Sequence, residues 1–362
     1  MKPTDFADEL GEWLRGDGPE SDIVMSSRIR LARNLGDFPF IKKCNDVHKA
    51  SIESTVCEKV TSHSDLADTV FVKVNDLEEL ERQFLVERQL ISREHSESSG
   101  ARSVAIDKQE VFSLMINEED HLRIQVMKSG LDLEKAWERV ETIDNALEEN
   151  IRFAFDSQLG YLTACPTNVG TGMRVSVMLH LPALVMTRQI EKVFRSLEKV
   201  NLAVRGLYGE GSQAMGEFYQ ISNQITLGKS ETDLINDVSE IVPVIIGYER
   251  KAREYLINES QDDLHDKVSR AIGTLQNAHQ ISSEETMQLL SKVRLGVNLD
   301  LIHDVQLSTV NKLFLRTQPA HLQVLAGKKL STTDRNVERA NYLRRHLNSS
   351  QGKSDSGEDL FV

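Results

Sequence analysis

The spacing of apolar residues changes along the chain and predicts two kinds of structure. Between about residues 20 and 128, short apolar runs alternate with turns, and residues 121–127 alternate strictly between apolar and polar positions, which is typical of a β-strand. Residues 23–25, 69–74 and 111–116 are further predicted strands. At residues 132–156 the apolar positions recur at helical spacing, which predicts a long helix packed on the sheet.

The second half of the chain contains more strands and then only helices. Strands are predicted at residues 174–181, 202–208 and 218–227, with a helical stretch at 183–200. Ser230 and Asp233 have the spacing of a capping box, and every segment from about 256 to 347 has helical spacing. The expected fold class is therefore α+β, an antiparallel β-sheet flanked by helices and followed by a small all-helical domain.

The same patterns divide the chain into four parts. We expect a lead-in at residues 1–20, a sheet domain at 21–254 and a helical domain at 255–347. Residues 348–362 are small, polar and acidic, which predicts a disordered tail. A length of 362 residues suits one large and one smaller domain.

Composition argues against membrane, secreted, disulfide-rich and nucleic-acid-binding proteins. No apolar run approaches the roughly 20 residues of a membrane span, and the first residues lack the pattern of a secretory signal, so we expect a cytoplasmic protein with no membrane contact. Three scattered cysteines, Cys44, Cys57 and Cys165, argue against a disulfide framework or a thiolate metal site. A formal net charge of -13 argues against nucleic-acid binding.

Arginines beside predicted strands are the first candidates for chemistry. The chain lacks the phosphate-loop, dinucleotide-binding and protein-kinase motifs, so ATP chemistry would need another device. Guanidinium groups stay charged and match phosphate oxygens, so a converging set could neutralise a triphosphate. One such arginine is most often a surface charge, but five in four short motifs favour the functional interpretation: Arg28, Arg30, Arg123, Arg174 and Arg205.

Carboxylates are the second candidates. Glu118, Glu119 and Asp120 crowd together before a predicted strand, and strand alternation would place Glu119 on the same face as Arg123. Glu210 is the natural second acid. Two carboxylates could hold a guanidinium in line with a γ-phosphorus and take its proton. The alternative interpretation of the first cluster is a charged β-turn.

Four motifs together resemble those of the guanidino kinases, and most closely those of the bacterial protein arginine kinases of the McsB type: SSRIRLARN, INEEDHLRIQ, CPTNVGTGMR and RG-x-x-GE. The resemblance makes residues 21–254 a catalytic domain, and the McsB-like helical domain extends it to about residue 347. It implies that ATP and Mg²⁺ are bound, with no side chain assigned to the metal. The positions matching the nucleotide site are Ser26, Ser27, Arg28, Ile29, Arg30, Arg123, Arg174, Val175, Ser176, Val177, Met178, Arg205, Gly206, Leu207, Tyr208, Gly209 and Glu210.

The resemblance also assigns the catalytic positions. Glu119 and Glu210 match the acids that bind the guanidinium, and Cys165 matches an active-site cysteine that by itself would be interpreted as an inert thiol. Small-molecule guanidino kinases carry a helical domain before the catalytic one, whereas about twenty residues precede SSRIR here. An open site suits an arginine within a protein. Tyr208 stands where arginine kinase has a further arginine, as is usual in the McsB type.

Two positions depart from the family pattern. Gln89 stands where related chains often have a histidine that contacts the nucleotide. The segment RNVERA matches the RDxxRA pocket for phospho-arginine, with Thr333 as the expected N-cap of its helix, but Asn336 replaces the aspartate, which predicts weaker binding. From spacing alone a solvated helix face is favoured, and the match reverses that preference. The expected allosteric pocket is Arg335, Asn336, Arg339 and Ala340.

The sequence therefore predicts an enzyme that transfers the γ-phosphate of ATP to arginine side chains of proteins. The resemblance implies marking for Clp protease degradation in a stress response, with CtsR-type repressors and misfolded proteins as substrates, a McsA-type activator, the ClpC-ClpP protease, and a second copy bound through the helical domain. Two alternatives stay open: a kinase of free arginine or another small guanidino compound, and a non-catalytic scaffold that binds phospho-arginine.

Overall fold

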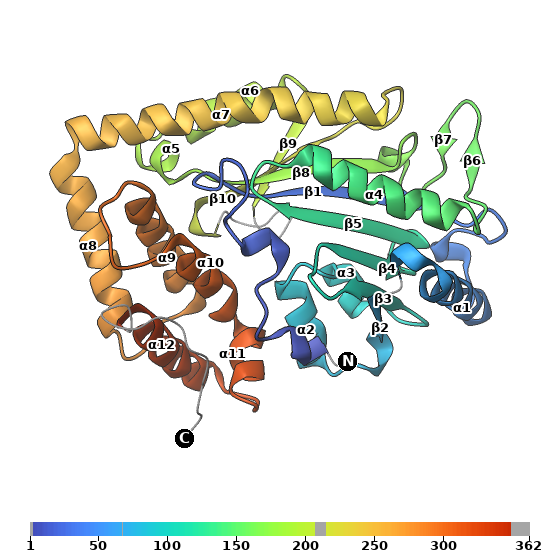
Figure 1. Cartoon of the computed structure of the whole chain (residues 1–362), viewed down its shortest axis with the longest axis horizontal. Coiled ribbons are helices and arrows are strands. Elements are labelled where there is room, and N and C mark those ends of the chain that lie inside the picture. Colours follow the sequence, from blue (N-terminus) through green and yellow to red (C-terminus); the bar gives the residue numbers. More distant parts are fainter. Residues whose placement is uncertain (1–2, 67, 207–214, 349–362) are drawn as a thin grey trace.

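A computed structural model describes residues 3–66, 68–206 and 215–348. Its centre is an eight-stranded sheet with the order β2-β3-β4-β5-β1-β8-β10-β9, in which all neighbours are antiparallel (Figure 1). A separate hairpin is formed by β6 and β7. The strands are β1 Val24–Arg33, β2 Thr69–Lys73, β3 Ser103–Asp107, β4 Phe112–Ile116, β5 Leu122–Ser129, β6 Phe155–Asp156, β7 Gly160–Tyr161, β8 Met173–His180, β9 Leu202–Gly206 and β10 Phe218–Asn223.

Helices surround the sheet and form the C-terminal part of the described chain. The first seven are α1 Asp46–Ser62, α2 Glu79–Glu87, α3 Arg93–Glu97, α4 Leu133–Glu148, α5 Pro182–Met186, α6 Ile190–Glu198 and α7 Glu231–Glu259. The helical domain contains α8 Gln261–Asn277, α9 Ser283–Asn298, α10 Leu307–Arg316, α11 Pro319–Leu325 and α12 Thr332–Asn348. None of the helices in the described ranges is long and apolar enough to cross a membrane.

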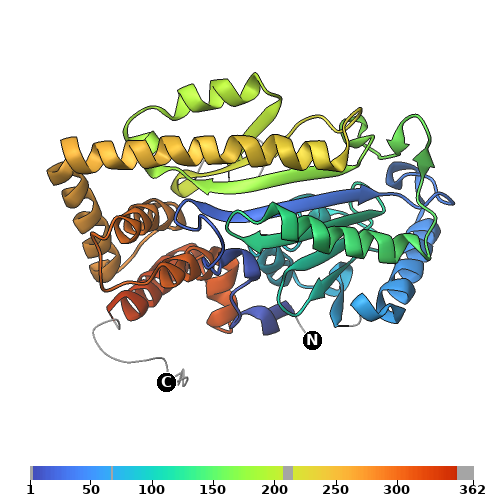
Figure 2. The ribbon, with the colours of Figure 1, turned by 45° about the horizontal axis from the view of Figure 1, so that its top comes forward.

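The two faces of the sheet differ because side chains alternate along each strand. On β1, Ile29 and Leu31 are fully buried on one face, where α4 packs on β1 and β5 and α7 packs on β8 and β10. Figure 2 shows these two helices lying across that face. Arg28 and Arg30 lie on the opposite face, so the sequence pattern leaves a charged surface in the middle of the fold.

Among the described residues, apolar clusters cover the charged face at its two ends. At one end Met25, Met178 and Phe218 pack with Trp13 and with helices of the C-terminal domain. At the other end α2 covers the strands β2, β3 and β4 through a second apolar cluster. The charged residues of β1, β5 and β8 lie between these two apolar layers.

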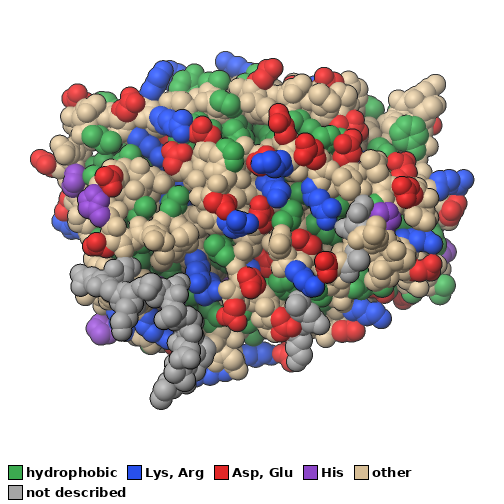
Figure 3. Space-filling model, viewed as in Figure 1, with side chains coloured by type: hydrophobic (Ala, Val, Ile, Leu, Met, Phe, Trp, Pro, Cys, Tyr) green, Lys and Arg blue, Asp and Glu red, His purple; other side chains and the backbone are tan. Residues whose placement is uncertain are grey.

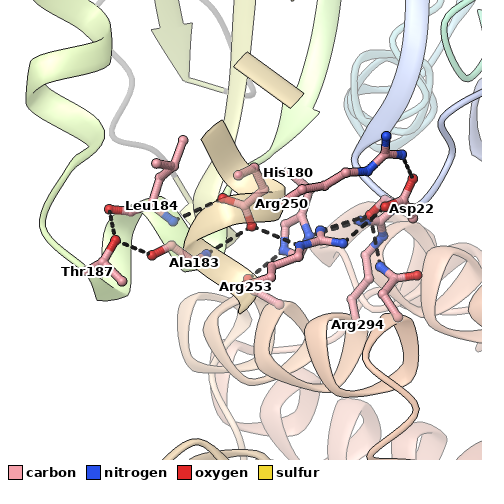
Figure 4. Close-up of polar contacts among 11 residues, drawn as sticks. Asp22, His180, Ala183, Leu184, Thr187, Arg250, Arg253 and Arg294 are labelled. Carbon is pink, nitrogen blue, oxygen red and sulfur yellow. Dashed lines mark hydrogen bonds and ion pairs between the residues drawn. The ribbon is translucent and has the colours of Figure 1, made fainter. Parts of the chain in front are cut away.

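A buried polar junction joins the sheet to the helical domain (Figure 4). Arg294 of α9 is fully buried and donates to the carbonyl oxygen of Asp22, at 3.0 Å, and to Nδ1 of His180, at 2.9 Å. Arg253 of α7 pairs with the Asp22 carboxylate at 3.2 Å and with Glu249 at 3.1 Å. Three separate parts of the chain therefore meet at residues 21–22, immediately before β1.

The antiparallel α+β fold with a C-terminal helical region is confirmed, and so is the capping box, since Ser230 and Asp233 bond each other's backbone N–H. Two element predictions are wrong. The predicted helix at 132–156 ends at Glu148, since β6 occupies 155–156, and the predicted helix at 183–200 is split into α5 and α6. The backbone turns at Arg188, where φ is +58°, which breaks helical geometry.

The structure also differs from the sequence in where elements begin and end. Helices α1 and α2 were not predicted, and β1 is ten residues long where only 23–25 was expected. Helix α7 runs without interruption through the predicted domain boundary at 254/255. The predicted disordered tail at 348–362 lies outside the described residues, apart from Asn348 at the end of α12.

Candidate active site

The strand register places the five candidate arginines on one face of the sheet. Arg30 lies opposite Arg174 on β8, and Ala32 lies opposite Arg123 on β5. Directly paired residues of antiparallel strands point to the same side. By the same rule Arg205 shares this side, since it is paired with Gln220, which is paired with Met178. Guanidinium groups from β1, β5, β8 and β9 therefore share the charged face.

These arginines repel one another. Burial and the charges of Arg123 and Arg174 lower the pKa of Arg28 to about 9. Burial and three neighbouring arginines, Arg28 first, also lower the pKa of Arg30 well below its ordinary value, and its buried Nε makes no hydrogen bond within the described chain. A buried donor without a partner is costly. Such a group of cations is complementary to a polyanion such as a phosphate chain.

Neutral amides hold Arg28 in place. Its two terminal nitrogens donate to Oε1 of Gln89, at 3.2 Å, and to Oε1 of Gln220, at 2.8 Å. An amide orients a guanidinium without cancelling its charge, so Arg28 keeps its attraction for an anion. Gln89 thus contacts the arginine face.

The acid that pairs with Arg123 is Glu118. Glu118 is buried, accepts a hydrogen bond from Ser92 Oγ, and forms an ion pair with Arg123 at 2.5 Å. Burial alone would raise the pKa of Glu118, but Arg123, Ser92 and the backbone N–H of Glu119 outweigh it and lower the value to about 2. Glu118 is therefore a fixed anion that orients one arginine.

Glu119 is exposed at the tip of the turn between β4 and β5. Burial, followed by the charges of Asp120 and Glu118, raises the pKa of Glu119. The prediction that strand alternation runs from Arg123 back to Glu119 is wrong, because residues 117–121 form a tight turn: Asn117 has a φ of +62°, and its N–H bonds the carbonyl of His121. An exposed carboxylate with a raised pKa is suited to bind a cation and accept a proton.

Asp120 connects this turn to the segment that carries Cys165. The buried Asp120 carboxylate accepts the backbone N–H of Ala164 at 2.6 Å and the side-chain amide of Asn34 at 2.6 Å. Cys165, which follows directly, is partly exposed, and its sulfur lies 3.0 Å from Oγ1 of Thr167. The structure thus brings Cys165 to the same end of the sheet as Glu119.

Eight of the twelve remaining predicted nucleotide-site residues fall into three groups. Ser26, Ser176 and Met178 lie on the arginine face, although Met178 packs into the apolar layer under the C-terminal helices. Gly206 ends β9 beside Arg205. Leu207, Tyr208, Gly209 and Glu210 lie outside the described residues.

The other four side chains do not reach the arginine face. Ile29, Val175 and Val177 are fully buried in the core beneath α4 and α7, on the opposite face. Ser27 donates to the carbonyl of Gly130 and accepts from a backbone N–H, so its hydroxyl is used to hold the chain after β5. Alternation turns these four side chains away from the arginines, so the prediction that these positions belong to the nucleotide site stays a prediction for their backbone.

The candidate phospho-arginine residues lie on α12 and adopt unequal environments. Arg339 is buried and donates to the carbonyls of Thr317 and Ile281 and to the side chain of Asn336, at 2.8 to 3.0 Å. Arg335 is partly exposed and donates to the carbonyl of Leu330. Ala340 is fully buried. In this conformation Asn336 is therefore an internal partner of Arg339.

The expected N-cap of that helix, Thr333, is corrected. Ser331 Oγ accepts the backbone N–H of Asp334 at 3.2 Å and donates to its carboxylate at 2.6 Å, so Ser331 closes the first turn. A serine followed three residues later by an acid is the sequence signal that would have identified this cap.

Two functional contacts were missed from sequence. Glu118 was counted only as part of an acidic cluster, and Gln220 was not considered. The alternation of Phe218–Asn223 could have placed Gln220 on the charged face. The partner of Glu118 depends on turn geometry that no local pattern specifies.

Within the described ranges no three His, Cys, Asp or Glu side chains lie close enough together to hold a metal ion. On the face viewed in Figure 3, lysines and arginines are interspersed with aspartates and glutamates. The arginine face is thus a local concentration of charge in a molecule of mixed surface.

Comparison with known families agrees with this geometry. The model of the C-terminal catalytic domain of ATP:guanido phosphotransferases matches residues 51–252, and the model of the protein-arginine kinase McsB C-terminal domain matches residues 261–358. Among solved structures, the duplicated taurocyamine kinase of Schistosoma mansoni has a TM-score of 0.60 at 26% identity, covering 65% of this chain and 34% of that one. A lombricine kinase gives 0.57 at 25% identity, covering 67% and 70%.

Similar sequences span nearly the whole chain. The protein-arginine kinase of Halothermothrix orenii is 46% identical over 339 residues, which is 94% of this chain and 97% of the relative. That of Bacillus subtilis is 42% identical over 356 residues, which is 98% of each. The chain therefore belongs to the ATP:guanido phosphotransferase family, within the branch that contains the protein-arginine kinases, and it is a phosphotransferase.

Proposed function

We propose that the chain transfers the γ-phosphate of ATP to arginine side chains of other proteins. The observation that carries the proposal is the set of arginines on one sheet face, two of which, Arg28 and Arg30, are half-buried among other cations. Support for the acceptor comes from relatives named protein-arginine kinase, which are 42% to 47% identical to this chain.

The arginine face binds the nucleotide in this proposal. Arg28, Arg30 and Arg123, the last oriented by Glu118, hold the phosphate chain and stabilise charge on the transferring group. A Mg²⁺ ion accompanying ATP would be coordinated mainly by phosphate oxygens and water, as Mg²⁺ often is in kinases, and would neutralise part of the phosphate charge.

The acceptor guanidinium is held by Glu119, and by Glu210 outside the described residues. A protonated guanidinium is a poor nucleophile, so Glu119 takes a proton as the new N–P bond forms and the bond from the γ-phosphorus to the ADP oxygen breaks. The raised pKa of Glu119 makes its carboxylate a stronger base than an ordinary glutamate. Cys165, at the same end of the sheet, lines the acceptor position.

The finer biological role is part of the same proposal. Phosphorylated proteins would be marked for the ClpC-ClpP protease in a stress response in the cytoplasm, with CtsR-type repressors and misfolded proteins as substrates, a McsA-type activator, and a second copy of the chain bound through the helical domain. We also propose that Arg335, Asn336, Arg339 and Ala340 bind phospho-arginine. Titration with phospho-arginine should then give tighter binding for Asn336→Asp than for wild type, and none for Arg339→Ala.

Mass spectrometry tests the acceptor directly. The protein is incubated with ATP and either a folded protein substrate or free arginine, and products are analysed under conditions that preserve acid-labile phospho-arginine. The proposal predicts phospho-arginine within the protein. Product found only on free arginine would favour the small-molecule alternative, and absence of transfer with retained phospho-arginine binding would favour the scaffold.

A further inference from the structure

Residues 87–92 run from the last residue of α2 to the residue before α3, and they connect the helical domain to the arginine face. Gln89 accepts a hydrogen bond from Arg28, and its backbone carbonyl accepts one from the side chain of Gln125 on β5 at 2.7 Å. Ser92 donates to Glu118, which is paired with Arg123. Two of the five arginines are thus positioned, directly or through one carboxylate, by this short segment.

The other end of the segment is fixed by the helical domain. The buried Glu87 carboxylate accepts the backbone N–H groups of Ala320, at 2.8 Å, and His321, at 3.0 Å, and the ring Nδ1 of His321 lies 2.9 Å away. Next along the chain, the buried Arg88 lies 3.3 Å from Nε2 of the same ring. Because Arg88 can only donate, Nε2 is the acceptor and the ring proton is on Nδ1, facing Glu87.

Gln89 has a backbone conformation that is unfavourable for a residue with a side chain. It has a φ of +60° and occupies the left-handed position after α2, where its N–H bonds the carbonyl of Val86 and the next N–H bonds the carbonyl of Leu85. Glycine is the residue that this position normally favours. The cost of a side chain here is understandable if that side chain has a function, and the contact that it makes is with Arg28.

We propose that residues 87–92 are a positioning element through which the C-terminal helices set the geometry of the nucleotide-binding arginines, with Glu87 as the anchor and Gln89 as the contact to Arg28. The inference rests on the proposed function, since it assigns nucleotide to the arginine face. It makes the helical domain part of the kinase site: displacement of α11 moves residues 87–92, and Arg28 loses one of its two amide partners.

Binding of ADP with Mg²⁺, measured by calorimetry together with the unfolding temperature, tests the proposal without any acceptor. Gln89→Gly should weaken ADP binding about tenfold, because the charged Arg28 side chain loses one of the two hydrogen bonds that orient it. Its unfolding temperature should stay the same or rise, because glycine is favoured at this φ. Unchanged ADP affinity in Gln89→Gly would overturn the role of Gln89.

Glu87→Gln tests the anchor, because an amide accepts through one oxygen only and cannot satisfy both backbone donors of α11. It should also weaken ADP binding, and the double variant with Gln89→Gly should bind no more weakly than the weaker single variant, since both act through one contact. Glu87→Asp, which keeps the carboxylate, should bind ADP with an affinity between those of wild type and Glu87→Gln. It replaces Glu87→Gln in the test if that variant does not fold. Wild-type affinity in either Glu87 variant, or additive losses in the double variant, would contradict the proposal.

The matched control is Lys329→Gln. Lys329 follows α11 and forms an ion pair with Glu78, the residue before α2, at 3.3 Å, but both side chains are more than 70% exposed. It bridges the same two parts of the molecule as Glu87 does, and exposed pairs contribute little. Its ADP affinity should equal that of wild type. If wild type binds ADP but phosphorylates no protein, the proposed acceptor fails while this inference stands.

Discussion

Two groups of arginines in this chain have opposite surroundings. At the junction before β1, Arg253 and Arg294 are met by carboxylates, carbonyl oxygens and one imidazole nitrogen. On the sheet face, Arg28 is met by two neutral amides, and Arg30 is repelled by three other arginines. The difference is instructive because acceptors from the chain make an arginine a structural link, whereas Arg30, whose Nε has no acceptor in the described chain, marks a site for an external anion.

The largest expected effect comes from removing a sheet-face arginine. Arg30→Met should lower phosphoryl transfer about 10²- to 10³-fold, the typical loss when one stabilising donor is removed from a transition state. The unfolding temperature should stay the same or rise, because Arg30 is repelled by Arg28, Arg123 and Arg174. Steady-state kinetics measures the loss of phosphoryl transfer, and thermal unfolding measures the stability of the variant. A strongly destabilised variant would place Arg30 with the structural group.

The opposite behaviour is expected at the junction. Arg294→Met removes the Arg294 donor from the Ser21 carbonyl and from the side-chain oxygen of Asn311, and one of three donors from the Asp22 carbonyl, which Arg253 and Asn298 also contact. We expect a loss of about 3 kcal/mol in the free energy of unfolding, as for other broken buried polar networks. Urea unfolding measures this. Wild-type stability in Arg294→Met would remove the distinction between the two groups.

Glu118 shares a feature with each group. It is a buried, paired acid like those of the junction, and its partner Arg123 belongs to the sheet face. Glu118→Gln should raise the KM for ATP about tenfold, since the amide still accepts from Ser92 but no longer fixes the guanidinium as an ion pair. Glu12→Gln, which breaks a partly exposed pair with Lys128, is the control and should keep the wild-type KM. Equal KM values for the two variants would show that Arg123 needs no orienting acid.

The smallest effect concerns pH. Burial, Asp120 and Glu118 raise the pKa of Glu119, so this carboxylate keeps its proton to a higher pH than an ordinary glutamate. Only the ionised form can accept a proton from the substrate, so kcat/KM should fall as the pH drops through a value above 4.5, the ordinary value for glutamate. A pH profile checks this. Glu119→Gln with full activity and the same acid limb would show that another group is the base.

Sequence alone could identify the five arginines, because each lies in a short polar motif beside an apolar run. Alternation is a local rule, but the shared face also depends on the register between strands such as β5 and β9, which are far apart in the sequence. Alternation failed at residues 117–121, where a turn with a left-handed Asn117 changes which acid meets Arg123.

Tertiary contacts account for the other misses. Ile151 is buried in the main core although α4 has ended at Glu148, so its apolar side chain extended the helical spacing beyond the helix. The contact of Glu87 with α11 joins residues 233 and 234 positions apart, and no local pattern contains it. Local rules therefore identified the charges of the site, and packing between distant elements determined which side chains orient them.

The central claim is that Arg28 and Arg30, which are surrounded by neutral amides and other arginines, bind the phosphates of a nucleotide. Thermal unfolding of wild type and Arg30→Met, each with and without saturating ADP and Mg²⁺, tests it most directly, because a ligand that binds only the folded state raises the unfolding temperature. The account predicts a clear rise for wild type and little or none for Arg30→Met, whose unfolding temperature without ligand is no lower. An equal ADP-induced rise in both proteins would contradict it.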